Sequence, residues 1–177
     1  MLLYKSGILW YNRVNTSFLK GITLMYRILF VCLGNICRSP MAEFVFNDML
    51  KKRGITNVIS ESAATSAEEL GNRVHYGTAA VLDRLGIDYS KKRARQITRE
   101  DCDSFDLLVG MESSNIRNMQ RFTRPHNNVK MHRLLDFSDN PRDISDPWYT
   151  HDFEGTYRDV LEGCEGLLKW LSEQKII

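Results

Sequence analysis

Cysteine is scarce in this chain, and the N-terminal segment lacks the features of a secretory signal. Four cysteines occur among 177 residues, which argues against a disulfide framework and indicates a protein of the reducing cytoplasm. The longest apolar stretch in the first 24 residues, Ile8 to Tyr11, is too short for a membrane span or a signal core. We therefore expect no membrane association.

Metal-ligand spacings, repeats, low-complexity tracts and linkers are also missing. The four histidines, His75, His126, His132 and His151, have no metal-ligand spacing and are expected on the surface or in loops. We expect neither a metal nor a cofactor. Apolar residues make up 43% and charged residues 26% of the chain, so disorder is not expected. The length fits one domain with a sizeable core.

Acidic residues are absent from the first 24 positions, which contain Lys5, Arg13 and Lys20. The whole chain has 24 basic and 22 acidic residues, a net charge of +2. Without those three cations the count is 21 against 22, so the net charge becomes −1. Because the net positive charge of the chain comes from this segment alone, it gives no reason to expect a nucleic-acid partner. We predict a non-native extension at residues 1–24, with a functional leader as the alternative, and one domain at residues 25–177 that begins naturally at Met25.

The most informative segment is VCLGNICRSP, residues 31–40. Its approach run, Ile28 to Val31, suits a strand that is buried on both faces in a parallel sheet. Gly34 and Asn35 accept unusual backbone angles, and Pro40 suits the first turn of a helix. Strand, tight loop and helix start therefore follow in order, and the backbone N–H groups of the loop could turn inward beside the positive end of the helix dipole. That arrangement predicts an anion site.

Cys32 and Arg38 stand at the two ends of this loop. The planar guanidinium of Arg38 matches two phosphate oxygens at once. The loop amides would also stabilise a thiolate at Cys32, to which Ser39 could donate a hydrogen bond. A thiolate that faces a bound phosphorus can attack it in line, giving a cysteinyl-phosphate that water hydrolyses. The alternative is an inert, packed cysteine; zinc is not expected, because no further Cys or His pair completes a site with Cys37.

VCLGNICRSP closely resembles the active-site loop of the low-molecular-weight protein tyrosine phosphatases, V-C-x-G-N-x-C-R-S-P, at every fixed position. The resemblance runs from about Tyr26 to the C-terminus, with further family-like stretches at SAATS (62–66), ARQIT (94–98), MESSN (111–115) and DPWY (146–149). It implies an enzyme that hydrolyses protein phosphotyrosine through a cysteinyl-phosphate. The implied partner is a phosphotyrosine protein, and the implied assembly is a monomer or weak dimer.

Strands alternate with helical patterns, which indicates an α/β fold. The family resemblance makes this expectation more specific. It implies a single-domain three-layer sandwich of the phosphotyrosine phosphatase I-like type, in which helices flank a central parallel sheet. Strands are expected at 107–109 and, more weakly, at 129–131, and a helix that contains Ala79, Leu82 and Leu85 is expected to end at Gly86. The apolar stripes of the first and last helices are expected at Met41, Phe44, Val45 and Met49, and at Tyr157, Val160, Leu161, Cys164, Leu167, Leu168 and Leu171.

A phenolate leaving group at neutral pH benefits from a proton donor. The polar stretch near the C-terminus offers five candidates: Asp136, Asp139, Asp143, Asp146 and Asp152. Asp146 stands out because Pro147 restrains the backbone beside it and Trp148 and Tyr149 follow on an expected polar loop. By resemblance, Asp146 is the general acid and the two aromatics face the substrate ring. The alternative is a surface turn with its aromatics folded onto the core.

The remaining site residues come from the loop and its support. We expect Asn35 to be left-handed, and the resemblance implies that Ser62 hydrogen-bonds to it. Cys37 lies close enough to Cys32 for a reversible disulfide, a redox role that the resemblance also implies. The substrate-binding set is Leu33, Gly34, Asn35, Ile36, Cys37, Ser39, Trp148 and Tyr149.

Ile36 bears on specificity, because relatives that act on phosphoarginine carry threonine at this position. An apolar Ile36 favours phosphotyrosine, with phosphoarginine as an alternative. Arsenate reduction is a second alternative, but it needs a relay of further cysteines, and Cys102 is alone among polar residues. A non-catalytic phosphotyrosine-binding module is the third.

Two positions depart from the family pattern. Family members often have aspartate where this chain has Glu112, and histidine where it has Lys92; both departures bear on fine specificity. The basic run 91–95 is interpreted as a structural face that could attract acidic phosphopeptides, rather than as a nucleic-acid patch. Cys164 falls on an apolar helix stripe and is interpreted as packing.

Overall fold

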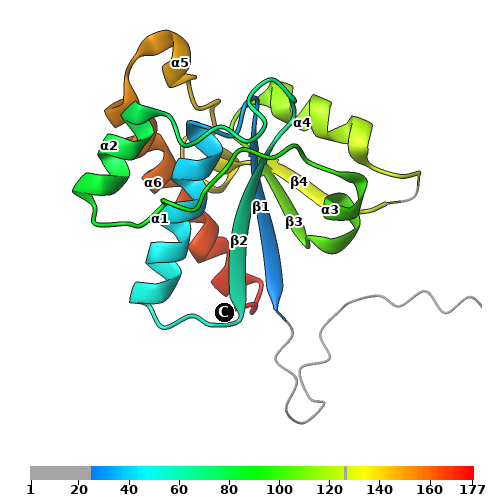
Figure 1. Ribbon diagram of the computed structural model, residues 1–177. Coiled ribbons are helices and arrows are strands. Elements are labelled where there is room, and N and C mark those ends of the chain that lie inside the picture. The colour runs from blue at the N-terminus through cyan, green and yellow to red at the C-terminus, as the bar shows by residue number, and fades with distance from the viewer. Residues whose placement is uncertain (1–24, 126) are drawn as a thin grey trace, which may run out of the picture.

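The computed structural model describes residues 25–125 and 127–177 (Figure 1). The extension predicted at residues 1–24 and His126 lie outside the described residues. The elements in chain order are β1 (Tyr26–Cys32), α1 (Arg38–Lys52), β2 (Val58–Ala64), α2 (Tyr76–Arg84), α3 (Arg99–Ser104), β3 (Leu107–Gly110), α4 (Ser113–Met119), η1 (Gln120–Phe122), β4 (Lys130–Arg133), η2 (Leu134–Phe137), α5 (Pro147–Thr150) and α6 (Phe153–Glu173).

The four strands form one parallel sheet in the order β2-β1-β3-β4. Helices α1, α2 and α6 cover one face, and α3 and α4 cover the other (Figure 1). This is the three-layer α/β sandwich that the sequence predicted, and the prediction is confirmed. Within the described residues, no helix is both long enough and apolar enough to cross a membrane.

Strand β1 is buried on both faces, as its apolar run predicted. Ile28 and Phe30 pack in the core cluster under α1 and α6, whereas Leu29 and Val31 pack in the cluster beneath α3 and α4. This alternation follows from the period of two in a β-strand. Cys32 ends β1, so the parallel arrangement places its thiol at the edge of the sheet where ligands of such folds bind.

The first helix differs in detail from its prediction. It begins at Arg38, with Cys37 at the N-cap position, so Pro40 lies in the first turn as expected. Met41, Val45 and Met49 are buried as expected, but Phe44 is only partly buried and packs at the border of the core. Arg38 is thereby placed in the first helical turn.

The second and last helices follow the apolar patterns closely. Helix α2 ends at Arg84, and Gly86 adopts a positive φ of 69° just beyond it, as a glycine at a helix C-terminus favours. Helix α6 buries Val160, Cys164, Leu167, Leu168 and Leu171 against the sheet. Strands β3 and β4 lie where the sequence placed them, within one to two residues at their ends.

Candidate active site

Cys32 lies at the floor of a tight loop, residues 32–39, which we call the phosphate loop. Its Sγ accepts a hydrogen bond from the backbone N–H of Asn35 at 3.2 Å and lies 3.0 Å from the hydroxyl of Ser39. The thiol is 3% exposed. Among the described residues, no protein group accepts a hydrogen bond from the N–H of Gly34, Ile36 or Cys37. The loop therefore offers donors to an anion above the sulfur.

Asn35 shapes the loop. Its φ is +57°, the left-handed conformation that asparagine tolerates better than most residues. Its side-chain nitrogen donates to the hydroxyl of Ser62 at 2.7 Å and to that of Ser39 at 2.9 Å. Its side-chain oxygen accepts from the backbone N–H of Arg95 at 3.2 Å. Gly34, by contrast, has no positive φ, so its backbone freedom is not what the loop uses.

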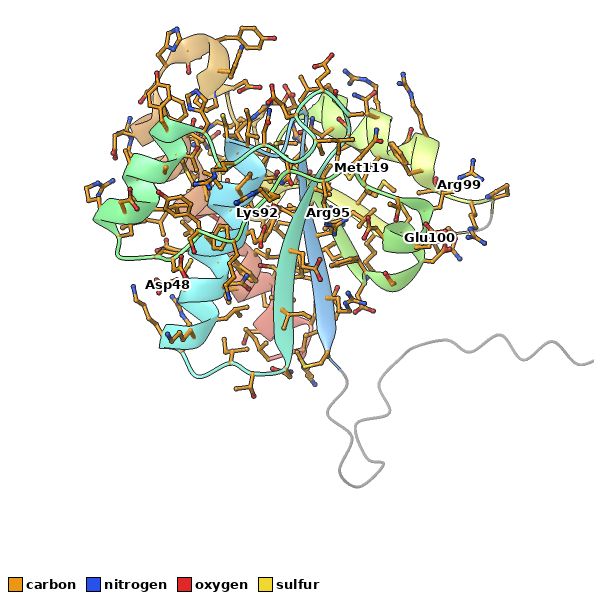
Figure 2. All side chains as sticks on the ribbon, in the orientation of Figure 1. Asp48, Lys92, Arg95, Arg99, Glu100 and Met119 are labelled. Carbon is orange, nitrogen blue, oxygen red and sulfur yellow. The ribbon has the colours of Figure 1, made fainter. Side chains whose placement is uncertain are left out.

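A second layer of polar side chains supports Ser62. The hydroxyl of Ser62 donates to Glu43 on α1 at 2.5 Å, and the same carboxylate oxygen accepts from Lys92 at 2.6 Å. Lys92 also donates to the carbonyl of Ser62 at 3.1 Å, and it comes from the segment drawn across α1 and β2 (Figure 2). Lys92 is thus a supporting residue behind the phosphate loop and does not face the pocket.

Arg38 is almost wholly buried, with an exposed fraction of 1%. Its Nη1 donates to the carbonyl of Ile144 at 3.0 Å. Its Nη2 donates to Glu112 at 3.2 Å and to Asp146 at 2.5 Å. The guanidinium is held from three directions, which pre-organises its planar fork at the loop. Glu112, which departs from the family pattern, is therefore a direct partner of Arg38.

Asp146 lies across the pocket from the phosphate loop and caps the short helix α5. Its Oδ1 accepts from the backbone N–H of Trp148 at 3.1 Å, while its Oδ2 contacts Arg38. Pro147 occupies the first helical position, which suits its fixed φ. The expected polar loop is therefore a helical turn, because Asp-Pro is an N-terminal helix signal.

The aromatics after Asp146 are exposed rather than folded onto the core. Trp148 is 50% and Tyr149 is 74% exposed. Trp148 packs edge-on against His75, whose ring stacks on Phe153 with centroids 5.0 Å apart. His75, which was expected on the surface or in a loop, lies in the loop before α2, caps that helix and is partly buried in this aromatic group. Burial lowers its pKa.

These side chains surround one pocket of about 160 Å³. Pockets for drug-sized ligands measure about 300–1,000 Å³, so this smaller space suits a phosphorylated side chain better than a large cofactor. The lining residues are Cys32, Leu33, Gly34, Ile36, Cys37, Arg38, Glu68, Glu69, Asp146, Trp148 and Tyr149. Asn35, Ser39 and Ser62 lie behind this lining and support it.

Four residues of this region were not predicted as support or as pocket lining, although Lys92 was noted as a departure from the family pattern. Glu43 and Lys92 support Ser62, and Glu68 and Glu69 line the pocket. Glu43 has a local signal, since it lies on the helix that begins at Arg38. The other three come from segments whose position only the tertiary fold sets.

The remaining cysteines separate into two environments. All four cysteines are free thiols. Cys102 is the buried residue of α3 and packs in the core cluster that contains Leu29 and Val31; burial raises its pKa to about 11. Cys164 lies on the buried face of α6, as predicted, and burial raises its pKa. Cys37 lines the pocket, and burial raises its pKa to about 12.

Within residues 25–125 and 127–177, no group of three or more His, Cys, Asp and Glu side chains could hold a metal ion.

Comparison with known proteins gives consistent matches over this domain. The family model described as low molecular weight phosphotyrosine protein phosphatase matches residues 27–176. The Bacillus subtilis low molecular weight protein-tyrosine-phosphatase YfkJ is 39% identical over 154 residues, which is 85% of this chain and 99% of that protein. Its crystal structure superposes with a TM-score of 0.82 over 88% of this chain and 99% of that chain.

Two further solved structures are informative. The low molecular weight protein tyrosine phosphatase SP-PTP of Streptococcus pyogenes is 40% identical and has a TM-score of 0.72 over 84% of this chain and 93% of that one. A Drosophila arginine phosphatase is 27% identical, with a TM-score of 0.74 over 80% of this chain and 95% of that one. The family model spans nearly the whole described domain, and its range includes every residue that lines the pocket. The chain therefore belongs to the low molecular weight phosphotyrosine protein phosphatase family.

Proposed function

We propose that this protein hydrolyses phosphotyrosine in proteins through a cysteinyl-phosphate intermediate. The observation that carries the proposal is the meeting of Cys32, Arg38 and Asp146 in one small pocket, with the Cys32 thiol at its floor. Family membership and the tyrosine-phosphatase names of the bacterial relatives support the substrate class. No metal or cofactor is needed for this chemistry.

In the first step, the thiolate of Cys32 attacks the phosphorus, a sulfur–phosphorus bond forms, and the bond to the tyrosine oxygen breaks. Asp146 donates its proton to that oxygen, so tyrosine leaves as the neutral phenol. Arg38 and the loop amides hold the non-bridging oxygens as charge develops on them. The hydrogen bonds that hold Arg38 fix the position of its guanidinium before a substrate binds.

In the second step, Asp146 acts as a base and takes a proton from water, whose oxygen attacks the phosphorus. The sulfur–phosphorus bond breaks, and inorganic phosphate and the Cys32 thiolate are released. The hydrogen bonds from Asn35 and Ser39 to the sulfur stabilise the departing thiolate. Ser62 supports this geometry through Asn35.

Two alternatives have less support. A Drosophila protein named an arginine phosphatase has a similar fold, which supports phosphoarginine hydrolysis as an alternative. Ile36, Trp148 and Tyr149, however, line this pocket with an apolar and aromatic wall that suits a flat ring. Arsenate reduction needs thiols that carry a disulfide outward, and Cys102 and Cys164 lie buried in the two core clusters.

A rapid-quench experiment with phosphotyrosine peptide tests the proposal. Mass spectrometry is expected to find phosphate on Cys32, and Cys32→Ser is expected to bind phosphate without turnover. Cys102→Ala, buried on the opposite face of the sheet, is the control and should retain the adduct. Product formation with no adduct on Cys32, or turnover by Cys32→Ser, would contradict the mechanism; absence of hydrolysis in the wild type would favour the non-catalytic binding module.

The same proposal includes a reducing cytoplasmic location, which the four free thiols support. Cell fractionation with an antibody against the chain tests this part separately.

A further inference from the structure

Two carboxylates at the edge of the pocket take no part in the proposed chemistry. Glu68 and Glu69 follow β2 and line the pocket beside the phosphate loop. With Asp146 they make three acidic side chains in the lining of a site for an anion, and Arg38 is the one basic side chain among those lining residues. Carboxylates at the mouth of the pocket repel a phosphate group and weaken its binding. The presence of Glu68 and Glu69 at this position therefore suggests that they serve another purpose in binding.

The segment that carries these glutamates is fixed to the phosphate loop. The backbone N–H of Thr65 donates to the carbonyl of Cys32, and that of Ser66 donates to the carbonyl of Leu33, both at 2.9 Å. Further along, the N–H of His75 donates to the carbonyl of Ile36 at 2.9 Å. The segment is therefore tied to the loop at both ends, which fixes the backbone that carries the glutamates relative to the phosphate loop.

Glu69 is the more closely held of the two. A Cβ added to Gly34 would lie 3.1 Å from the Cγ of Glu69, so the glutamate stem packs directly on the phosphate loop. Its Oε2 accepts from the side chain of Asn72 at 2.6 Å. This contact also gives a reason for glycine at position 34, because a larger residue would press on the Glu69 stem. Glu68 is exposed, and its N–H donates to the hydroxyl of Ser66 at 3.1 Å.

No cation of the described part of the chain neutralises these carboxylates. Neither Glu68 nor Glu69 forms an ion pair with any described residue. Arg38 is occupied by Glu112 and Asp146. The basic run 91–95 is directed elsewhere: Lys92 pairs with Glu43, and Arg95 pairs with Glu61 and Asp101. The negative charge of Glu68 and Glu69 is therefore available to the substrate residues on either side of the phosphotyrosine.

We propose that Glu68 and Glu69 select substrates in which lysine or arginine lies next to the phosphotyrosine, and that they disfavour acidic flanking sequences. A peptide cation would complement charges that are otherwise unpaired, whereas a peptide carboxylate would meet two like charges held in place. This reverses the expectation that the 91–95 run attracts acidic phosphopeptides. The inference rests on the proposed phosphotyrosine activity and adds its sequence preference.

The test compares three phosphotyrosine peptides that differ only in flanking residues, with lysine, alanine or glutamate on both sides. We expect kcat/KM to be about three- to tenfold higher for the lysine peptide than for the glutamate peptide at low salt, and the ratio to shrink as salt screens the charges. In the Glu68→Gln/Glu69→Gln double variant, the ratio should fall toward one. Glutamine retains the packing on Gly34 and can still accept from Asn72.

Glu100→Gln is the matched control. Glu100 is an exposed carboxylate on α3, far from α5 and the pocket mouth (Figure 2), and its removal should leave the ratio unchanged. A wild-type ratio near one, or a ratio that persists in the double variant, would overturn the charge preference while leaving the proposed reaction intact. If the wild type hydrolysed neither the peptides nor a small aryl phosphate, the proposed function would fail, and the ratio of peptide Kd values from calorimetry would then test the preference by itself.

Discussion

The ammonium of Lys92 and the carboxylate of Glu43 form a nearly enclosed ion pair, with Nζ and Oε2 2.6 Å apart and side chains 10% and 13% exposed. Because the same carboxylate oxygen accepts from Ser62, and Ser62 accepts from Asn35, three hydrogen bonds connect Lys92 to the left-handed residue of the phosphate loop. Loss of Lys92 would leave Glu43 without its charge partner, and the effect would reach the site through Asn35.

We therefore predict that Lys92→Met destabilises the fold by about 3 kcal/mol, since an unpaired carboxylate remains in a mostly buried position. Phosphate should also inhibit the variant less strongly than the wild type. Urea unfolding and inhibition by inorganic phosphate measure the two effects. Combining Lys92→Met with Glu43→Gln should recover part of the stability.

Lys52→Met is the matched control for that experiment. Lys52 pairs with Asp48, labelled in Figure 2, on the same helix as Glu43, but its side chain is 70% exposed. An exposed pair of this kind contributes about 0–1 kcal/mol. If the two lysine substitutions lowered the free energy of unfolding equally, the burial of Lys92 would have no effect on stability.

Asp146→Asn should separate chemistry from binding. We expect kcat to fall by about 10²- to 10⁴-fold with a phosphotyrosine peptide, because the general acid is lost. Inhibition by inorganic phosphate should stay as strong or become stronger, since Arg38 loses a competing carboxylate. Asp139→Asn, an exposed residue outside the pocket, is the control. A matched loss of phosphate affinity and rate would instead indicate a structural role for Asp146.

Peroxide should inactivate the wild type reversibly. Oxidation of Cys32 to a sulfenic acid would be followed by attack of Cys37, which forms a disulfide and releases water. Because burial raises the pKa of Cys37 to about 12, its thiolate fraction rises with pH, and we expect faster disulfide formation at pH 9 than at pH 7. Activity regained with dithiothreitol is the measurement. Recovery by Cys37→Ser as complete as that of the wild type would refute the role of Cys37.

His75 gives a prediction on stability and pH. Burial lowers its pKa, an effect that Glu69 partly opposes. The folded state then binds a proton less readily than the unfolded state, so the contribution of His75 to stability is present above the ordinary pKa of about 6.5. It is lost as the pH falls below that value, through the pKa of the folded protein. Protonation would also remove the acceptor that caps α2 at Gly77.

Unfolding by urea at pH 7.5 and at pH 5.5 tests this sign. The free energy of unfolding of the wild type should fall more between these values than that of His75→Asn, in which asparagine can still cap the helix but does not titrate. His132→Asn on β4 is the control. An equal fall in wild type and His75→Asn would exclude a contribution from this imidazole.

Gly166 provides a prediction about packing alone. Alanine at an open helix position is favoured over glycine by roughly 0.5–1 kcal/mol. At position 166, however, a Cβ would run into the backbone carbonyl of Phe137, so Gly166→Ala should destabilise by about 1–3 kcal/mol. Glu165→Ala, exposed on the same helix, should change stability little. Thermal unfolding compares the two, and a more stable Gly166→Ala would contradict the tight contact between α6 and η2.

The sequence predicted those parts of the fold in which local pattern and burial agree. The run from Ile28 to Val31 is buried on both faces because it forms a central strand, and α6 buries the stripe expected of it. Helices α3 and α4 have six and seven residues, too few to show an apolar period. They are specified by capping side chains, among them Thr98 with Asp101, rather than by hydrophobic spacing.

For the site, the sequence predicted the residues that carry chemistry and the support of Asn35 by Ser62, but not the residues that hold Ser62 in turn. Cys32, Arg38 and Asp146 were expected together, and the structure places them around one pocket. Lys92 lies 49 positions from Glu43, so no local pattern could pair them. Glu112 and Lys92 were noted only as departures, and the structure places both in the supporting hydrogen bonds.

In the proposed mechanism, the hydrogen bond between Arg38 and Asp146 would link phosphate binding to proton donation. One guanidinium nitrogen donates to the carboxylates of both Glu112 and Asp146, so a phosphate dianion that binds Arg38 would compete with two anionic partners. Asp146 would then be released from its cation at the moment when its proton is required. Under this mechanism, recognition of the oxyanion and release of the acid would depend on the same arginine, and a ligand without that charge would leave Asp146 bound to Arg38.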